Sequence, residues 1–181
     1  MRTKVFYAAK YVYLLFLRVE KKFQSFFLTF WAKLQMSSYG KGLKVNYYSR
    51  FMGKVIVGNN CNFNGMRVDG NGSVIWGNNF HSGKECLIIT SSHNYDKGDS
   101  LPYDSSRFVN YNVQIEDNVW FGHRVTVIGN ITIGEGTIVA AGSVVVKSTP
   151  PLSIVGGNPA KIIRYRDKEH YFKLKEEGKF C

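Results

Sequence analysis

One histidine of the sequence lies in a segment whose residue types could do chemistry. His93 stands in the polar stretch TSSHNYDKGDSLPYDSSRFVNYN, residues 90–112, with Asn94 and Asp96 close to it in the chain. Because imidazole titrates near neutral pH, a positioned histidine can act as a general base. Asn94 and Asp96 could orient the ring or contact a substrate. The alternative interpretation is that all three residues form an exposed turn.

The other three histidines are weaker candidates for a catalytic or metal-binding role. His81 and His123 lie near corners of the repeat described below, and His170 lies in a charged C-terminal segment. A zinc site of three histidines would use His81, His93 and His123, but these lack the close histidine pair that such a site would show. The sequence also has no GxSxG nucleophile motif. We therefore expect neither a metal nor a covalent acyl-enzyme.

A six-residue repeat must position these groups. An aliphatic or aromatic residue recurs at every sixth position, and these residues are Ile115, Phe121, Val127, Ile133, Val139 and Val145. Neither a helix nor a lone strand has this period. A short, strict repeat indicates stacked coils, each stable only against its neighbours, and three six-residue sides would close one triangular coil. The sequence therefore predicts an all-β solenoid.

The repeat divides the chain into three parts. It is loose from about residue 51 to 89, is interrupted by residues 90–112, and is strict from there to about residue 147. We predict a β-helix over 51–150 with a looped-out insertion at 90–112. Long loops of this kind are usually functional. We also predict an N-terminal amphipathic helical segment over 1–50, and a turn followed by a short helix over 151–181.

Composition and net charge indicate which partners and which cellular compartment to expect. The 181 residues carry a formal net charge of +11, which favours an anionic partner such as a phosphorylated ligand or a membrane surface. The odd number of cysteines, with no CxxC pair, favours a reduced cytoplasmic protein over a disulfide scaffold. The basic residues gather at the termini without a recognised nucleic-acid-binding motif, so we expect no nucleic acid partner.

The N-terminal segment has two interpretations. Apolar residues recur at spacings of three and four over residues 5–34, while basic residues greatly outnumber the single acid, Glu20. The longest apolar run, YVYLLFL at 11–17, is too short to span a bilayer. This segment could pack on the β-helix or a neighbouring subunit, or lie in an anionic membrane surface as a peripheral contact.

Three stretches together carry a family resemblance. IITSSHNYD, then VWFGHRVTVIGNITIGEGTIVAAGSVVVKSTPP, and then GGNPAKIIR follow one another in that order. This order closely resembles the hexapeptide-repeat acetyltransferases, especially those that O-acetylate sugars and polysaccharides, and the resemblance covers about residues 55–166. It implies a left-handed parallel β-helix, a homotrimer, acetyl-CoA as donor and His93 as the catalytic base.

The resemblance also implies a coenzyme A site in a groove between subunits. The positions that match the family's donor site are Trp120, Ala141, Gly142, Lys147, Lys161 and Arg164. Small residues let pantetheine lie against the backbone, and cations suit the phosphates. Trp120 could instead pack against a neighbouring subunit, and Lys161 and Arg164 could be simply solvated. Where several family members have Thr-Lys, this chain has Val146-Lys147, so one hydroxyl contact is missing.

These observations favour an O-acetyltransferase that acts on a sugar hydroxyl of a surface polysaccharide or its precursor. N-acylation of an amino sugar nucleotide is the nearest alternative, although such enzymes often carry an extra nucleotide-binding domain that residues 1–50 are too few to form. Two further classes are a metal enzyme of the γ-carbonic-anhydrase type and a non-catalytic scaffold or membrane-binding module. The scaffold would account for the basic N-terminus but for neither His93 nor the GNPAK turn.

Overall fold

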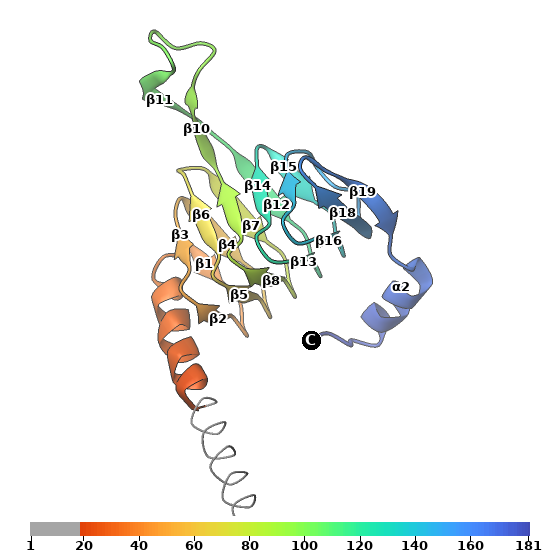
Figure 1. Cartoon of the computed structure of the whole chain (residues 1–181). Helices are drawn as coiled ribbons and strands as arrows, with labels where there is room; N and C mark the ends of the chain where they lie inside the picture. The colour runs from red at the N-terminus through yellow and green to blue at the C-terminus, as the bar shows by residue number, and fades with distance from the viewer. Residues whose placement is uncertain (1–18) are drawn as a thin grey trace, which may run out of the picture.

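Residues 19–181, which the computed structural model describes, form a parallel β-helix flanked by a helix at each end (Figure 1). Sheets A and C each contain five strands, and sheet B contains seven. Sheet A consists of β1 (Ser38–Tyr39), β4 (Lys54–Val57), β7 (Ser73–Trp76), β12 (Asn112–Ile115) and β15 (Ile131–Ile133). Sheet C consists of β3 (Arg50–Phe51), β6 (Arg67–Asp69), β9 (Leu87–Ile89), β14 (Thr126–Ile128) and β17 (Val144–Val145).

Sheet B forms the third side of the triangle and extends past the last coil. Its strands are β2 (Lys44–Tyr47), β5 (Asn62–Asn64), β8 (His81–Lys84), β13 (Trp120–Phe121), β16 (Ile138–Val139), β18 (Ser153–Gly157) and β19 (Ala160–Tyr165). Strand β19 turns back antiparallel to β18, while the other pairs in the three sheets are parallel. The predicted fold class, a left-handed parallel β-helix with helical segments at its ends, is confirmed.

The strand register shows why the repeat has a period of six. Ile115 pairs with Ile133, Phe121 with Val139, and Val127 with Val145, so equivalent residues of successive coils lie directly above one another. All six residues of the strict repeat are buried. The set two positions earlier, from Val119 to Ser143, is buried as well. Every inward position therefore packs on its counterpart in the next coil.

The solenoid begins earlier than the sequence indicated. Helix α1 ends at residue 33, and the strands of a first coil begin at Ser38, inside the 1–50 segment that we expected to be helical. Leu43, Val45 and Phe51 supply buried positions of this coil. No glycine separates Val45 from Phe51, so this corner lacks the signal that marks the later repeats, and the sequence pattern did not show the coil.

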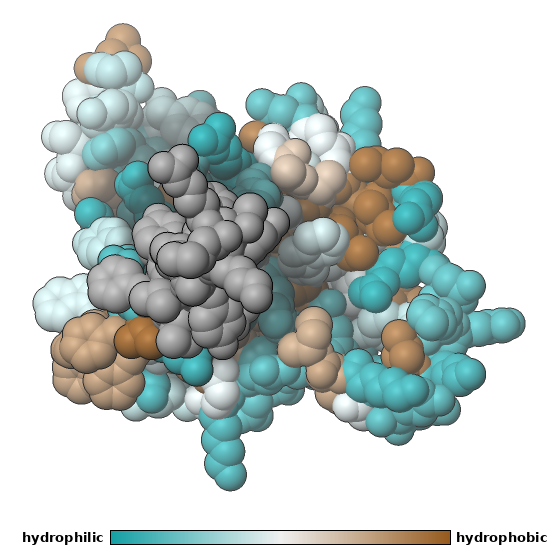
Figure 2. Space-filling model, turned by 60° about the horizontal axis from the view of Figure 1, so that its bottom comes forward, coloured by the Kyte–Doolittle hydropathy of each residue, from teal (hydrophilic) through white to brown (hydrophobic). Residues whose placement is uncertain are grey.

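Helix α1, described over residues 19–33, covers the open edge of this first coil. Strand β2 is the last strand of sheet B, so its outer backbone groups have no neighbouring strand. Thr29 Oγ1 accepts a hydrogen bond from the Val45 N–H at 2.9 Å, and Ser25 Oγ donates to the Val45 carbonyl at 3.0 Å. The helix thus closes an edge that could otherwise pair with another chain. In the view of Figure 2, brown apolar side chains remain exposed at the lower left.

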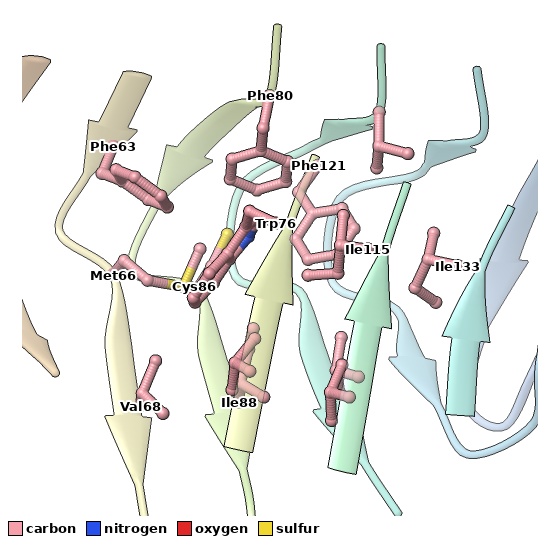
Figure 3. Close-up of a cluster of buried hydrophobic side chains, with 14 of the residues drawn as sticks. Phe63, Met66, Val68, Trp76, Phe80, Cys86, Ile88, Ile115, Phe121 and Ile133 are labelled. Carbon is pink, nitrogen blue, oxygen red and sulfur yellow. The ribbon is translucent and has the colours of Figure 1, made fainter. Parts of the chain in front are cut away.

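Aromatic residues fill the middle of the core (Figure 3). Phe63, Trp76, Phe80 and Phe121 are buried, and their rings meet in edge or tilted contacts, with 5.1 Å between the centroids of Phe80 and Phe121. Such aromatic pairs add stability beyond the area that they bury. Smaller aliphatic residues fill the later coils, where the repeat is strict.

The C-terminal helix α2 (Lys168–Glu176) docks on the last coils through one tyrosine. Tyr171 is buried, and its hydroxyl donates to Glu135 Oε1 at 2.8 Å and accepts from Asn118 Nδ2 at 2.9 Å. Burial acts to raise the pKa of Glu135, but hydrogen bonds from Lys175 and Tyr171 outweigh it and hold that pKa below its ordinary value. Among residues 19–181, no helix is long and apolar enough to cross a bilayer.

The packing of the core predicts that substitutions at two adjacent residues differ greatly in their effect on stability. Phe121→Ala should lower the free energy of unfolding by about 3–5 kcal/mol, because it opens a cavity inside the stacked rings. Trp120→Ala is the matched control, since the Trp120 side chain is 53% exposed and should change stability by less than about 1 kcal/mol. Urea denaturation followed by circular dichroism measures both. Equal effects of the two substitutions would contradict the assigned register.

The cysteines predict a selective reaction with thiol reagents. Burial raises the pKa of Cys61 to about 11 and also raises the pKa of Cys86, whereas Cys181 is exposed. In the native protein, Ellman's reagent should modify Cys181 first and the other two roughly a hundredfold more slowly. All three thiols should react at once after denaturation in guanidinium. Rapid modification of Cys61 in the native protein would mean that the coils open readily.

Candidate active site

The segment at 90–112 leaves the solenoid as an antiparallel hairpin. Strand β10 (Ser91–Asn94) pairs with β11 (Asp104–Asn110), and the pair projects from the corner between β9 and β12 (Figure 1). The coil holds the root of the hairpin, because the Thr90 N–H donates to the Asp69 carbonyl at 2.8 Å and the Tyr111 N–H donates to the Thr90 carbonyl at 2.7 Å. His93 lies on β10, three residues after Thr90.

Two aromatic rings of the hairpin position His93. The His93 imidazole stacks on the Tyr103 ring, with 3.9 Å between centroids and an interplanar angle of 16°. Phe108, the cross-strand partner of His93, lies on the ring at a centroid distance of 4.6 Å. The His93 side chain remains partly exposed. The hairpin therefore fixes the plane of the imidazole while leaving part of the ring accessible.

The hydrogen bonding of the His93 ring is incomplete. Its Nδ1 atom is buried and has no partner among residues 19–181. Neither neighbouring candidate reaches it, since Asn94 Oδ1 accepts from the Lys97 N–H at 3.1 Å and Asp96 is exposed. A buried nitrogen without a partner is uncommon and calls for an explanation such as a catalytic role or a group supplied from outside the chain.

Sequence reasoning missed the residues that support the hairpin. Asp104 is buried and accepts hydrogen bonds from Ser106 Oγ at 2.6 Å and from the Ser106 N–H at 2.9 Å, which lower the pKa of its carboxyl group. Tyr103 and Phe108 were also not singled out. The available signal was the presence of aromatic residues in an otherwise polar segment, but their contact with His93 depends on a hairpin register that the sequence does not display.

The positions expected to meet the donor lie elsewhere on the solenoid. Ala141 and Gly142 form the exposed corner between β16 and β17. Gly142 has φ of +74° with open space beside it, and its N–H donates to the His123 carbonyl of the preceding coil at 2.8 Å. A side chain at Gly142 would be strained by this φ. The corner therefore presents bare backbone to solvent.

Three cations and one aromatic residue complete the predicted set. Trp120 lies on β13, and its side chain is half-exposed on the outer face of sheet B. Lys161 and Arg164 are exposed on β19, and Lys147 is exposed after β17. None of these three cations forms an ion pair with another residue of the described chain. They are free to meet an anionic ligand.

One chain does not bring all these residues together. His93 projects from the corner between sheets C and A, whereas Ala141 and Gly142 form the corner between sheets B and C. Trp120, Lys161 and Arg164 lie on sheet B, on another side of the triangle from His93. Lys147 alone follows the same edge as the hairpin, further along the solenoid. Within 19–181, no three His, Cys, Asp or Glu side chains gather into a possible metal site.

A pocket of about 340 Å³ that the sequence did not indicate lies between sheet B and the C-terminal segment. Trp120 and Ile138 line it on the solenoid, and Tyr171 and Phe180 line it on the C-terminal side. The last residue closes one end, because the Cys181 carbonyl lies 3.0 Å from both Asn60 Nδ2 and His81 Nε2. Trp120 therefore borders an apolar recess rather than open solvent alone.

Comparison with known proteins connects this geometry to a family. The family model for the bacterial transferase hexapeptide, six repeats, matches residues 112–147. A predicted acetyltransferase of Schizosaccharomyces pombe is 32% identical over 128 residues, which make up 71% of this chain and 56% of that protein. A predicted acetyltransferase of Staphylococcus aureus is 49% identical over 57 residues, which make up 32% of this chain and 29% of that protein. The matches thus span from under a third to just over half of these relatives.

Solved structures share the fold. AntD, an N-acyltransferase from Bacillus cereus in complex with dTDP and 3-hydroxybutyryl-CoA, has a TM-score of 0.67 at 18% identity, over 80% of this chain and 83% of its own. A hexapeptide-repeat acetyltransferase of Vibrio cholerae complexed with acetyl-CoA has a TM-score of 0.60 at 24% identity, over 75% and 74% of the two chains. Residues 112–147 carry the bacterial transferase hexapeptide repeat, and the chain shares the fold of these solved structures.

Proposed function

We propose that this protein transfers an acetyl group from acetyl-CoA to a sugar hydroxyl of a surface polysaccharide or its precursor. The observation that carries the proposal is His93, whose imidazole is clamped between Tyr103 and Phe108 on an arm that projects from the solenoid and yet stays partly exposed. A hydroxyl acceptor needs such a base, because the neutral alcohol is a weak nucleophile. The similarity to acetyltransferases gives the donor class.

The reaction needs one proton carrier. His93 takes the proton of the sugar hydroxyl as its oxygen attacks the thioester carbonyl of acetyl-CoA. The tetrahedral intermediate then expels the coenzyme A thiolate, and the proton on His93 passes to that sulfur. The products are an acetyl ester and free coenzyme A. General base catalysis of this kind contributes about 10² to 10⁴ in rate.

A homotrimer accounts for the separation of the candidate residues. Because His93 and the Ala141–Gly142 corner lie on different edges of one triangle, the donor site would form where the hairpin of one subunit meets the coils of the next. Pantetheine would then lie along the bare backbone at Ala141 and Gly142, with Trp120 near its reactive end. Lys147, Lys161 and Arg164 would meet its phosphates. A group from that second subunit, or Asn94 or Asp96 after a small movement, would supply the hydrogen-bond partner that the buried Nδ1 of His93 lacks.

N-acylation of an amino sugar remains the second candidate. AntD is an N-acyltransferase, and this chain covers 83% of its length, so a chain of this size needs no extra domain for such a reaction. The size argument for a hydroxyl acceptor is therefore weaker than the sequence implied. Alkaline hydroxylamine separates the two cases once acetyl-CoA has been removed, because it cleaves the acetyl ester of an O-acetylated product and leaves an amide intact. In this proposal the protein works in the cytoplasm, which supplies acetyl-CoA and keeps free cysteines reduced.

His93→Ala should lower turnover of a sugar acceptor at least a hundredfold, because the hydroxyl loses its base. Binding of acetyl-CoA and the unfolding midpoint should stay unchanged. His170→Ala, on the exposed face of α2, is the control and should retain full turnover. Turnover is measured as release of free thiol. Near-normal turnover in His93→Ala would remove this residue from the mechanism.

Calorimetric titration with acetyl-CoA tests the donor separately. Binding in the micromolar to sub-millimolar range should weaken at higher salt, because the phosphates meet lysine and arginine side chains. Lys161→Gln with Arg164→Gln should weaken binding and reduce this salt dependence, whereas Lys97→Gln on the hairpin should do neither. Absence of binding at millimolar acetyl-CoA would contradict the proposed transferase activity without affecting the assignment of the fold.

A further inference from the structure

Helix α1 exposes a stripe of large apolar side chains that the proposed reaction does not use. These residues are between 52% and 69% exposed, and they are Val19, Phe23, Phe26, Phe27, Phe30, Trp31 and Leu34. Phe27 contacts Phe23 at a centroid distance of 4.7 Å and Phe26 at 5.5 Å, so the aromatic rings form one continuous cluster. Contiguous exposed apolar surface on this scale marks an interaction site in most proteins.

The helix cannot turn this stripe toward the solenoid. Its opposite face is already occupied, since Ser25 and Thr29 bind the backbone of Val45, Ala32 is fully buried, and Leu28 packs against the core. At 3.6 residues per turn, these inward residues lie on the side of the helix opposite Phe23, Phe30 and Leu34. The aromatic stripe is therefore held outward by the contacts that close the first coil.

Two lysines border one flank of the stripe. By the same helical geometry, Lys22 and Lys33 lie along this flank of α1, whereas Lys21 falls on the inward side, between Leu28 and Ala32 in projection. Glu20 is the one acidic residue within 19–33. Lys33 also rests over the Tyr39 ring at 5.0 Å, beside the solenoid. A large apolar face with cations along its flank is typical of helices that lie in the surface of a membrane.

We propose that the outer face of α1 docks this protein on an anionic lipid bilayer. The aromatic stripe enters the boundary between headgroups and acyl chains, and the flanking lysines meet lipid phosphates. A second copy of α1 is the competing occupant of an apolar stripe. Charge favours the bilayer, because antiparallel packing of two such helices brings their lysine flanks together, whereas anionic headgroups neutralise them. The proposal is independent of the reaction and of His93.

Flotation of the full-length protein with vesicles tests this docking surface. The wild type should bind phosphatidylcholine vesicles that contain phosphatidylglycerol, and added salt should weaken this binding. Phe23→Ser, Phe27→Ser and Phe30→Ser combined should lower the partition coefficient at least tenfold. The matched control is Leu101→Ser with Tyr95→Ser, which removes side chains that are 92% and 66% exposed on the hairpin loop, away from α1 (Figure 1). This control should bind vesicles like the wild type.

The lysines provide a second set of variants on the same helix. Replacement of Lys22 and Lys33 by glutamine, singly, should lower binding to the anionic vesicles roughly fivefold each at low salt. Circular dichroism of every variant should match the wild type, because the packed face of α1 is unchanged. Binding that is equal on vesicles of phosphatidylcholine alone would overturn the role of the lysines.

Light scattering distinguishes the bilayer from a second copy. If the phenylalanine variant loses a defined oligomer while its vesicle binding matches the wild type, the stripe is a subunit interface and the proposal is wrong. Failure of the wild type to float with anionic vesicles also overturns it. Because acetyl-CoA binding and turnover of a water-soluble sugar acceptor are measured without lipid, failure of the docking proposal leaves the proposed reaction untouched.

Discussion

The structure depends on one constraint, the in-register stacking of successive coils. No side of a coil is wide enough to bury its own inward residue, so each depends on the same position of the coil before and after it. Backbone hydrogen bonds between coils enforce this register, and side-chain ladders at the corners extend it. Asn59 donates to Asn78 and Asn78 to Asp117, each one coil apart. A change at one inward position is therefore felt by both neighbouring coils.

A stack of coils has two open ends, and each is closed by a different device. At the first coil, side chains of α1 satisfy the backbone of β2, and Gln35 Oε1 accepts a hydrogen bond from the Phe51 N–H of β3 at 3.0 Å. At the last coils, β19 folds back on β18, and Tyr171 anchors α2 through Glu135. Both devices need only one face of their helix. The other face of α1 is left with its aromatic residues in solvent, and α2 leaves a recess beside Trp120.

The sequence predicted the part of the fold in which every repeat carries the same signal. From Ile115 to Val145 the period alone identified the inward residues, and the structure buries all of them. Val45 and Phe51 of the first coil continue the spacing of six into Val57 and Phe63 of the second, but the stretch from Asn46 to Arg50 has no corner glycine and conceals the first coil. Among the candidate site residues, His93 was singled out from the family resemblance, together with its place in the polar segment. Tyr103 and Phe108 were not, because the register of a hairpin arises from pairing and has no period to read.

The same stacking explains how the polar hairpin at 90–112 can hold His93, the candidate base, in place. At the corner where the hairpin leaves, Thr90 stays in the coil and the chain rejoins it at Tyr111, whose N–H bonds to the Thr90 carbonyl. The coil below must come very close at this point, since a Cβ on Gly72 would lie 2.0 Å from the Tyr111 oxygen and 2.5 Å from the Thr90 oxygen. Only glycine permits that approach. The solenoid thus fixes the root of the hairpin, and the rings of Tyr103 and Phe108 contact His93 further out. A residue outside the repeat thereby acquires a position set by the repeat, which is the condition that the proposed proton transfer imposes.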